Sequence, residues 1–341
     1  MSVSRESKKV IIIALSVVIL AISFVLSLML GAEHVSPAAV FGFGDKFENI
    51  ILWKLRLPRS LLVLITGILL GGSGAVFQLF FRNPLAEPGV MGISSGATLG
   101  AVIASVFFGK IASSLPVLSK IAIFISPVNC FAFVTSLFAG LFVTFLAYTK
   151  AGRNSSIMLL LCGTALGTLY SSASSLVLLT CNKELRSVYT WILGSFNGRG
   201  WNELFFILIP SFISLIIMFI IARPLDLLSG GEKSALSLGV EVDGLRILVL
   251  ISGALAVSCG VCAGGTIGFV GLIAPHIVRK IVGPKGKVLI PLSMVFGGAL
   301  LLLSDTFARI IIAPAEIPAG VITGILGVPF FLALCLKNQK S

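Results

Sequence analysis

Long apolar segments, separated by short polar breaks, run along almost the whole chain. They lie near residues 10–31, 60–81, 90–109, 121–148, 157–180, 204–222, 245–263, 265–279, 289–310 and 317–336. About 20 apolar residues in a helix cross the hydrocarbon core of a bilayer, so most of these segments are long enough to span a membrane. The pattern predicts an all-α polytopic membrane protein with about ten transmembrane helices and with both termini on the same side.

Two of the ten segments are unusual. Segment 10–31 follows several basic residues, as the apolar part of a signal peptide does, but it is about twice as long as such a part, so we interpret it as an uncleaved first span. Segment 265–279 is short, rich in glycine and contains Pro275, which removes a backbone donor and bends or ends a helix. If this segment does not span, the C-terminus changes sides.

Composition and charge indicate a single domain and the orientation of its helices in the membrane. Of the 341 residues, 57% are hydrophobic and 11% are charged, which leaves no room for a soluble domain. We therefore expect one transmembrane domain over residues 1–341. The 25 Lys and Arg outnumber the 13 Asp and Glu, but they stand singly or in pairs at the ends of apolar runs. This placement is typical of membrane topology rather than of nucleic-acid binding, and it favours both termini in the cytoplasm.

Residues that could carry chemistry are sparse. The chain has two histidines and no G-x-x-x-x-G-K-[ST] phosphate loop, so we predict neither catalytic nor metal-binding residues, no bound cofactor, and no enzyme activity. His276, at the end of its predicted helix, is more typical of a capping or paired residue than of a proton-linked or ligand-binding group. Cys259 and Cys262 form C-x-x-C, but they lie among Ala, Gly and Val at helical spacing, which favours close helix packing over a metal or redox site.

The stretch LSGGEKSALSLG, residues 228–239, looks like the L-S-G-G-Q signature of ATP-binding cassette ATPases. It lies in the polar connection 223–244 between two predicted spans, which points to a cytoplasmic loop. Its spacing is L-x-x-G-E-x-x-A-x-x-L-G, formed by Leu228, Gly231, Glu232, Ala235, Leu238 and Gly239. That spacing predicts two short helices with Leu and Ala on one face and with Gly ending each. The segment is either a solvated loop or a docking surface for a cytoplasmic partner.

Three arginines lie on the side that the positive-inside bias disfavours. Arg56 and Arg59 flank Pro58 before the second span, so both can project outward from the same helix start. They either snorkel at the interface or meet a partner of opposite charge. Arg309 has a local alternative, because Asp305 lies four residues earlier and can pair with it.

Several longer strings, in a shared order, resemble one known family. They are LRLPRSLLVLITGILLGGSGAVFQ, RNPLAEPGVMGISSGA, LLLCGTALG, RPLDLLSGGEKSALSLGV, GGTIGFVGLIAPHIVR, LLLSDTFARI and EIPAGVITGILGVPFFLALC. On these strings the chain resembles the permease subunits of type II ABC importers, the FecCD and vitamin B12 permease family, which take up iron-siderophores, haem and cobalamin. The resemblance covers nearly the whole chain and implies the type II importer transmembrane fold.

The resemblance also implies roles for particular residues. The six residues of the L-x-x-G-E-x-x-A-x-x-L-G spacing match the family's coupling helices, with Leu228, Glu232, Ala235 and Leu238 facing a separate ATPase that uses ATP and Mg. Residues matching Arg56, Arg59 and Arg309 receive acidic residues of an extracytoplasmic binding protein. Asn154, Ser155 and Ser156 fall at the cytoplasmic gate, where small hydroxyl residues close the pathway; from the residues alone they indicate a turn followed by an N-cap.

By the same resemblance the chain works in an assembly in the cytoplasmic (inner) membrane of a prokaryote. The expected partners are a second permease copy, two ABC ATPase subunits, one substrate-binding protein and membrane lipid, with no nucleic acid. The expected substrate is an iron(III)-siderophore, then haem or cobalamin, with an oxyanion as a more distant alternative. An ion-coupled secondary carrier would need acidic residues at mid-membrane, and the acids here fall in loops or at the ends of predicted helices.

Overall fold

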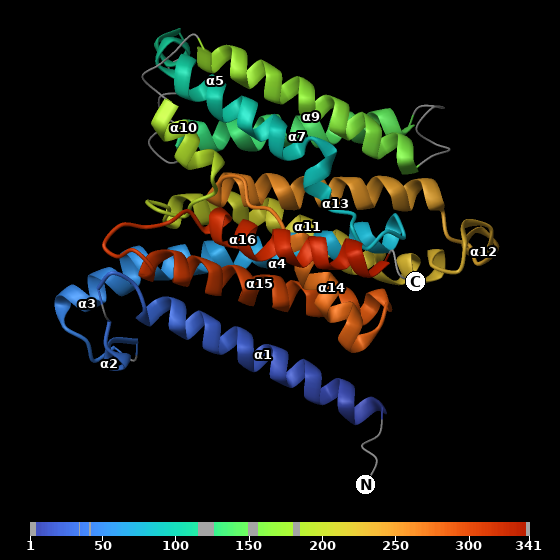
Figure 1. Cartoon of the computed structure of the whole chain (residues 1–341), viewed down its shortest axis with the longest axis horizontal. Helices are drawn as coiled ribbons and strands as arrows, with labels where there is room; N and C mark the ends of the chain where they lie inside the picture. The colour runs from blue at the N-terminus through green and yellow to red at the C-terminus, as the bar shows by residue number, and fades with distance from the viewer. Residues whose placement is uncertain are drawn as a thin grey trace.

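The computed structural model describes residues 5–33, 35–40, 42–114, 126–148, 156–179 and 185–338, and these residues form helices and connections without a strand. Ten helices cover the ten predicted segments (Figure 1), and they are α1 (Arg5–Met29), α4 (Leu57–Phe80), α5 (Ile93–Ser114), α7 (Pro127–Tyr148), α9 (Ser156–Leu179), α11 (Trp201–Leu228), α13 (Val242–Gly264), α14 (Val270–Val282), α15 (Gly286–Ile310) and α16 (Ala319–Asn338). Six short elements lie between them, namely α2 (Pro37–Val40), α3 (Lys46–Ile50), the π-helical turn η1 (Ile51–Arg56), the 3₁₀ turn η2 (Pro88–Met91), α10 (Leu185–Ile192) and α12 (Glu232–Ser237).

Seven helices in the described part of the chain are long and apolar enough to cross a membrane. One of them is longer than the sequence predicts, because α3, η1 and α4 form a continuous helix over Lys46–Phe80. The apolar stretches of α5 and α16 are shorter, at Ile93–Phe108 and Ala319–Ala333. The all-helical membrane architecture is therefore confirmed, while the number of ten crossings stays a prediction.

The segment that looked unusual in the sequence is only partly helical. Residues 265–269 form an irregular stretch in which Gly265 and Phe269 have positive φ angles, and the helix that follows, α14, has 13 residues. At 1.5 Å per residue α14 is about 20 Å long, which is less than the roughly 30 Å of a hydrocarbon core. Gly264 packs against Phe196 at one end of the helices, and Gly286 packs against Ala222 at the other. The chain thus returns along the bundle by an irregular stretch and a short helix together.

Helix α4 lies at the centre of the structure and packs against α11, α13, α14 and α15. Glycine makes the closest of these contacts possible. A Cβ atom at Gly71 would come within 2.2 Å of the Ser293 carbonyl of α15, and one at Gly74 within 1.8 Å of the Gly271 carbonyl of α14. Small residues at such positions let backbones approach, which is the main way helices associate where lipid removes the hydrophobic drive. Cys259 and Cys262 are free thiols buried in the same core.

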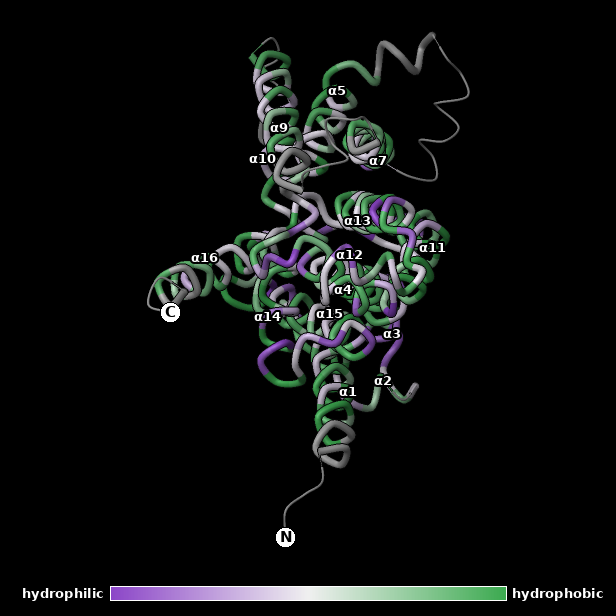
Figure 2. Tube along the Cα trace, turned by 90° about the vertical axis from the view of Figure 1, so that its right-hand side faces the viewer, coloured by the Kyte–Doolittle hydropathy of each residue, from purple (hydrophilic) through white to green (hydrophobic). Residues whose placement is uncertain are grey.

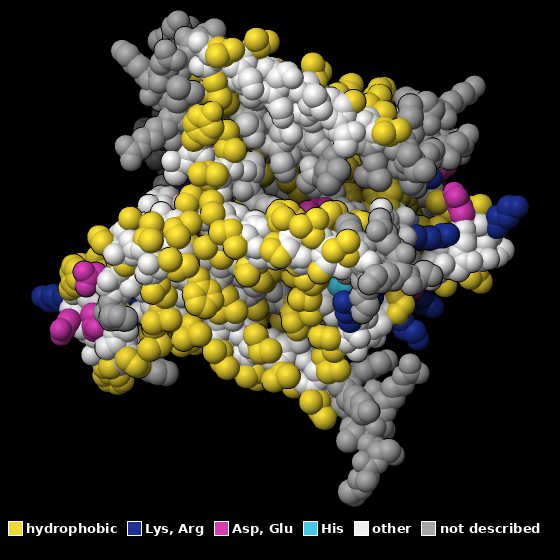
Figure 3. Space-filling model, viewed as in Figure 1, with side chains coloured by type: hydrophobic (Ala, Val, Ile, Leu, Met, Phe, Trp, Pro, Cys, Tyr) yellow, Lys and Arg dark blue, Asp and Glu magenta, His cyan; other side chains and the backbone are white. Residues whose placement is uncertain are grey.

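The bundle has two ends, which we call the α3 end and the α12 end after the short helices that mark them (Figure 1). Helix α1 begins, and α16 ends, at the α12 end. Viewed along the helices, α1 and α16 project from the central group, and α5, α7 and α9 form a layer on one side of it (Figure 2). Charged side chains gather mainly at the two ends, and hydrophobic side chains cover much of the surface between them (Figure 3), as a lipid-facing belt requires.

Candidate functional site

A basic pocket of about 420 Å³ opens at the α3 end. We call it the arginine pocket. The charged side chains that line it are those of Lys54, Arg56, Arg59, Arg199, Arg309, Glu33 and Glu316. The three arginines singled out in the sequence thus come together from η1, α4 and α15, although Arg309 lies some 250 residues from the other two.

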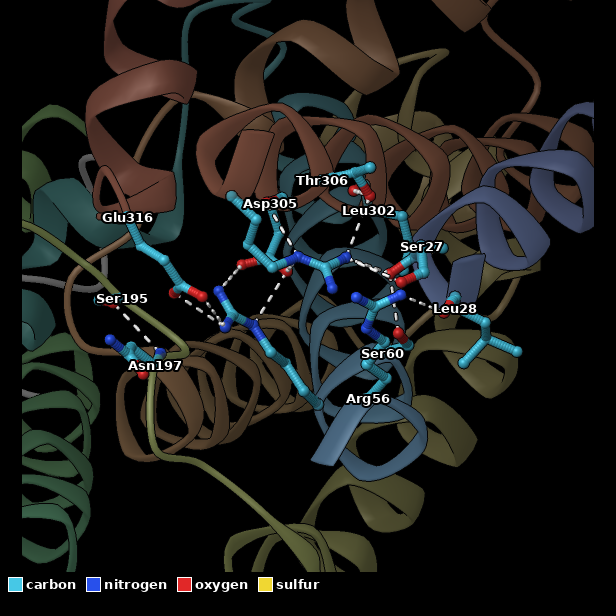
Figure 4. A network of polar contacts seen from close by, with 12 residues as sticks. Ser27, Leu28, Arg56, Ser60, Ser195, Asn197, Leu302, Asp305, Thr306 and Glu316 are labelled. Atoms are coloured by element: carbon cyan, nitrogen blue, oxygen red, sulfur yellow. Dashed lines mark hydrogen bonds and ion pairs between the residues drawn. The ribbon is translucent and has the colours of Figure 1, made fainter. Parts of the chain in front are cut away.

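Arg59 is held by two carboxylates (Figure 4). Its Nε and Nη2 atoms donate to Asp305 at 3.1 and 2.8 Å, and its Nη1 donates to both carboxylate oxygens of Glu316 at 3.1 and 2.9 Å. Asp305 is fully buried on α15, and Glu316 lies in the connection before α16. Arg59 therefore joins α4, α15 and the approach to α16 through paired, charge-assisted hydrogen bonds.

Arg309 shares the same buried carboxylate. Its Nε lies 3.3 Å from an Asp305 oxygen, so the local pair that the spacing of four residues suggested is present. Its Nη2 donates to the Ser27 carbonyl of α1 at 2.9 Å and to the Ser27 hydroxyl at 3.0 Å. One buried aspartate thus serves two arginines, and α1 is bound to α15 through the second of them.

Arg56 caps the end of α1 instead of pairing with an acid. Its Nη1 donates to the carbonyls of Leu28 and Met29 at 2.9 and 2.7 Å, and its Nη2 donates to the carbonyl of Glu33. The last carbonyls of a helix have no partner within it and carry partial negative charge, so a guanidinium is well placed there. Arg56 is the last residue of the π-helical turn η1.

The expectation that Arg56 and Arg59 project outward is wrong. Their exposed fractions are 7% and 9%, because α1 and α15 pack on the face of the helix that carries them. Sequence reasoning also missed Arg199, which lines the same pocket from the connection between α10 and α11. The signal available for Arg199 was a single basic residue before a predicted span, on the side where cations are disfavoured.

The segment 223–244 forms the α12 end of the structure. Helix α11 continues to Leu228, so the segment holds one short helix, α12, where the sequence predicted two. The glycines do bound this helix as expected. Gly231 and Gly239 have φ angles of +116° and +82°, which a residue with a Cβ rarely adopts, and they precede and follow α12.

The structure divides the predicted coupling residues into two groups. Leu228 and Ala235 are buried in this chain's own core, with exposed fractions of 4% and 0%. Glu232, Leu236 and Leu238 are exposed, the two leucines by 56% and 63%. The expectation that Leu228 and Ala235 face a partner is therefore not met in this structure, and Leu236, which the spacing did not single out, joins the exposed surface.

The base of this segment is tied to two central helices. Arg82, just after α4, donates from Nη2 to the Leu228 carbonyl at the last residue of α11 at 2.5 Å. Asp226 of α11 accepts from the backbone nitrogens of Gly286 and Lys287, at 2.5 and 3.4 Å, at the start of α15. A carboxylate at a helix N-terminus satisfies free N–H groups and the positive end of the helix dipole.

The predicted gate falls largely outside the described residues. Asn154 and Ser155 lie outside them, and Ser156 is the first residue of α9, where only its backbone is described. Beyond Ser156, α9 carries a row of hydroxyls that the sequence analysis missed. Thr164, Thr168, Ser171, Ser172 and Ser175 line an open groove of about 490 Å³ with Gly89, Gly92 and Ser95.

Helix α9 is both the least apolar and the least buried of the seven candidate spans. Its exposed hydroxyls recur three or four residues apart, which places them on one face of the helix. A lipid-facing helix normally presents apolar side chains, so this face requires water or another protein surface in front of it. The regular spacing of Thr and Ser was the signal that could have found it.

His276 on α14 contacts α16 instead of capping a helix. Its ring stands edge-on to Phe330 at 5.5 Å between ring centres, and neither ring nitrogen has a hydrogen-bond partner among the described residues. The neighbouring Arg279 donates from Nη2 to the Gln78 side chain of α4 at 3.3 Å. No group of three or more His, Cys, Asp and Glu that could hold a metal occurs in the described part of the chain.

Comparison with known proteins gives consistent matches. Residues 19–337 match the FecCD transport family. The chain is 38% identical over 310 residues to the cobalamin import permease of Halobacterium salinarum, covering 91% of this chain and 79% of that protein. It is 34% identical over 340 residues to the iron(3+)-hydroxamate import permease of Bacillus subtilis, covering 98% and 99%.

A solved structure agrees with these sequence matches. It is described as an inward-facing conformation of a metal-chelate type ABC transporter, and its chain is 32% identical to this one. The two superpose with a TM-score of 0.82, over 96% of this chain and 99% of the other. The arrangement of helices described above is therefore that of an ABC transporter membrane subunit.

Proposed function

This chain belongs to the FecCD transport family, and from that premise we propose that it carries an iron(III)-siderophore-type chelate across the membrane. The family is one of permease subunits of ABC importers, so the chain is a multi-pass transporter component and not an enzyme. Its substrate arrives from an extracytoplasmic binding protein, and separate ATPase subunits supply the work with ATP and Mg.

The observation that carries this proposal is the contrast between the two ends of the bundle. The α3 end has a pocket rich in arginine, which suits an acidic protein surface. The α12 end presents Glu232 beside the exposed Leu236 and Leu238 on a short helix, which suits a cleft in another protein. We assign the α3 end to the outside and the α12 end to the cytoplasm, which places both termini in the cytoplasm.

We propose a homodimer because a single copy leaves the hydroxyl face of α9 uncovered. Pairing two copies about a twofold axis would place two such faces around a shared polar path. The groove residues, Thr164 to Ser175, then form part of the wall of the pathway. Asn154, Ser155 and Ser156 precede this wall in sequence and keep the proposed role of cytoplasmic gate. Residues 1–341 act as one permease domain, with 223–244 as its coupling segment.

Among substrates, the relatives support metal chelates first. One relative imports an iron hydroxamate and another imports cobalamin, so haem or cobalamin is the second candidate. An oxyanion is a more distant alternative. An ion-coupled secondary carrier is disfavoured because Asp305, the most deeply buried acid among the described residues, is already shared by Arg59 and Arg309. The other two enclosed acids are not at mid-helix, since Glu203 lies in the first turn of α11 and Glu87 in the connection after α4.

Uptake by reconstituted vesicles tests the proposal. The permease would be purified with the ATPase encoded beside it, placed in vesicles with ATP inside, and supplied with the neighbouring binding protein and radioactive iron(III) hydroxamate or cobalamin. We expect ATP-dependent accumulation of the iron chelate. Accumulation of cobalamin alone would select the second candidate, whereas accumulation driven by a proton or sodium gradient without ATP would refute the importer assignment.

A further inference from the structure

The donors of the arginine pocket are unequally occupied. Arg59 and Arg309 already hold Asp305, and Arg59 also holds Glu316. Arg56 holds three backbone carbonyls at the end of α1. The three arginines that the sequence singled out thus already hold partners within the chain. An incoming carboxylate would meet guanidinium groups whose charge is shared with carboxylates or backbone carbonyls of this chain.

Arg199 is different, because its side chain has no hydrogen bond or ion pair among the described residues. Its Nε atom is buried without a partner. A guanidinium has five N–H donors, and the Nη donors of Arg199 have no hydrogen-bond partner among the described residues either, so they are left for a ligand in the pocket that this side chain lines. The nearby Glu203 uses its Oε2 atom to accept from the Gly200 nitrogen at 3.0 Å.

The backbone holds Arg199 firmly at this position. Its nitrogen donates to the Phe196 carbonyl at 3.2 Å in a turn that contains Gly198 with φ of +70°. Phe196 is fully buried, and its ring packs against Gly264 at the end of α13. Arg199 therefore stands on a turn anchored in the core, so little ordering is needed when a ligand binds.

Arg199 also lies where two cavities meet. With Asn197 it lines both the arginine pocket and a second cavity of about 310 Å³. Hydroxyl and amide side chains, including those of Ser105, Ser126 and Ser195, line part of the second cavity, beside the apolar Val128, Val188 and Trp191. Such a surface accepts a small charged group together with its water.

The charge of the pocket favours an anion. Five cationic side chains line it, against the carboxylates of Glu33 and Glu316 at its wall and Asp305 beneath Arg59. Glu316 also shows which ligand the pocket accepts, because its carboxylate binds the Arg59 guanidinium in two-point contact at 2.9 and 3.1 Å. The pocket already holds one carboxylate in this way, and Arg199 has room for a second.

We propose that Arg199 is the first residue of this pocket to bind an acidic side chain, Asp or Glu, of the extracytoplasmic binding protein. The inference rests on the proposed function, and it adds a residue that the sequence pattern did not assign to docking. It also implies an order in which the carboxylates of the binding protein bind the pocket. The partner's carboxylate binds Arg199 without breaking any bond in the permease, and only a further carboxylate competes with Glu316 for Arg59.

Binding measurements on the intact assembly test this. The permease and its ATPase would be held in lipid nanodiscs, and the binding protein encoded beside them would be titrated at low and at physiological salt. Arg199→Gln is expected to weaken binding at least about tenfold, and Arg199→Glu more, with a smaller salt dependence than in the wild type. Lys46→Gln is the matched control, since Lys46 is an exposed cation of α3 outside the pocket lining, and it should change affinity less than about twofold.

A charge exchange makes the test specific. Arg199→Glu combined with Arg in place of the partner's acidic residue should recover most of the lost affinity, which a merely misfolded variant would not do. Unchanged affinity in Arg199→Gln and Arg199→Glu, with wild type and Lys46→Gln both binding, overturns this inference and leaves the proposed function intact. A wild-type assembly that binds no such protein overturns both. If the Arg199 variants bind the binding protein as the wild type does but take up less free chelate in its absence, Arg199 contacts the substrate, and this inference is also overturned.

Discussion

Asp305 is the residue on which the group of arginines at the α3 end depends for its stability. Its side chain is fully buried and has a bidentate contact with Arg59 and a second contact with Arg309. Asp305→Asn preserves the shape of the side chain but removes its charge. Arg59 then keeps only the partly buried Glu316, and Arg309 keeps only carbonyl and hydroxyl oxygens.

The expected cost follows from burial. Removing one partner of a buried ion pair typically costs about 3–5 kcal/mol, because a charge is left without compensation. We expect a loss in this range for Asp305→Asn, which corresponds to roughly a hundredfold to several thousandfold in the unfolding equilibrium. Glu316→Gln makes the same chemical change on a side chain that is 24% exposed, and Arg59 keeps Asp305, so its cost should be about 1 kcal/mol or less.

Unfolding in mixed detergent and dodecyl sulfate micelles, followed by the fluorescence of the three tryptophans, measures the difference between the two variants. Arg59→Met and the double variant Arg59→Met, Asp305→Asn complete a thermodynamic cycle. The double variant should lose less stability than the sum of the single ones, since each single change strands a charge. Equal losses for Asp305→Asn and Glu316→Gln, or strict additivity in the cycle, would refute the view that a buried shared carboxylate holds this end together.

Three further changes test other parts of the structure. Gly74→Ala should prevent folding, since its Cβ would meet the Gly271 carbonyl at 1.8 Å, whereas Gly324→Ala enters open space and should be tolerated; the yield of monodisperse protein decides. Burial raises the pKa of Glu87, in the connection after α4, to about 7. The neutral carboxyl is therefore favoured in the fold, and stability should fall as pH rises from about 4.5 through 7, but not in Glu87→Gln; thermal unfolding against pH measures this. Leu238→Asp should lower ATP-driven uptake while leaving the stability of the permease nearly unchanged, because this leucine is exposed in the chain alone. Vesicle uptake measures the first quantity and the midpoint of unfolding measures the second.

Each of these has an outcome that contradicts it. Well-folded Gly74→Ala protein would mean that α4 and α14 do not approach as closely as described. A parallel pH dependence of wild type and Glu87→Gln would assign the titration to another group. Full uptake by Leu238→Asp would remove this leucine from the contact with the ATPase.

The helices could be predicted from the sequence because each one contains its own long run of apolar residues. Each of the ten apolar segments corresponds to a helix, and the glycine-rich segment 265–279 is helical only in part, since Gly265 and Gly268 lie in the irregular stretch before α14. The continuation of helix α4 back through η1 and α3 was missed, because Lys46, Glu48 and Lys54 interrupt the apolar pattern there. Polar side chains at a helix end do not stop the backbone from continuing.

The site could be predicted only in part, because burial is a property of the packed chain. Arg56, Arg59 and Arg309 were found as a group, but nothing local shows that α1 and α15 cover them or that Glu316 reaches Arg59 across 257 residues. The same limit applies to Ala235 and Leu236, which lie side by side on α12 with opposite exposure. Residues four apart share a face of a helix such as α12, but the spacing does not show which face the rest of the chain covers. That depends on where α11 ends and how α12 is placed after it.

The two ends of the bundle are joined through one rigid pair of helices. At the α3 end, Arg59 and Asp305 bind α4 to α15, and at the α12 end, Arg82 and Asp226 bind the base of segment 223–244 to the same two helices. Between these points the glycines of α4 bring the two backbones into direct contact, where no side chain can yield. A displacement of α12 must therefore either move α4 and α15 together or break the bonds of Arg82 and Asp226. Since α4 and α15 also carry Arg59 and Arg309, motion of the pair would reach the arginine pocket as a rigid-body shift. The flexible elements of the cycle should be sought in α16 and α1, the long helices that contact the rest of the chain least, and in α9, the least buried of the candidate spans.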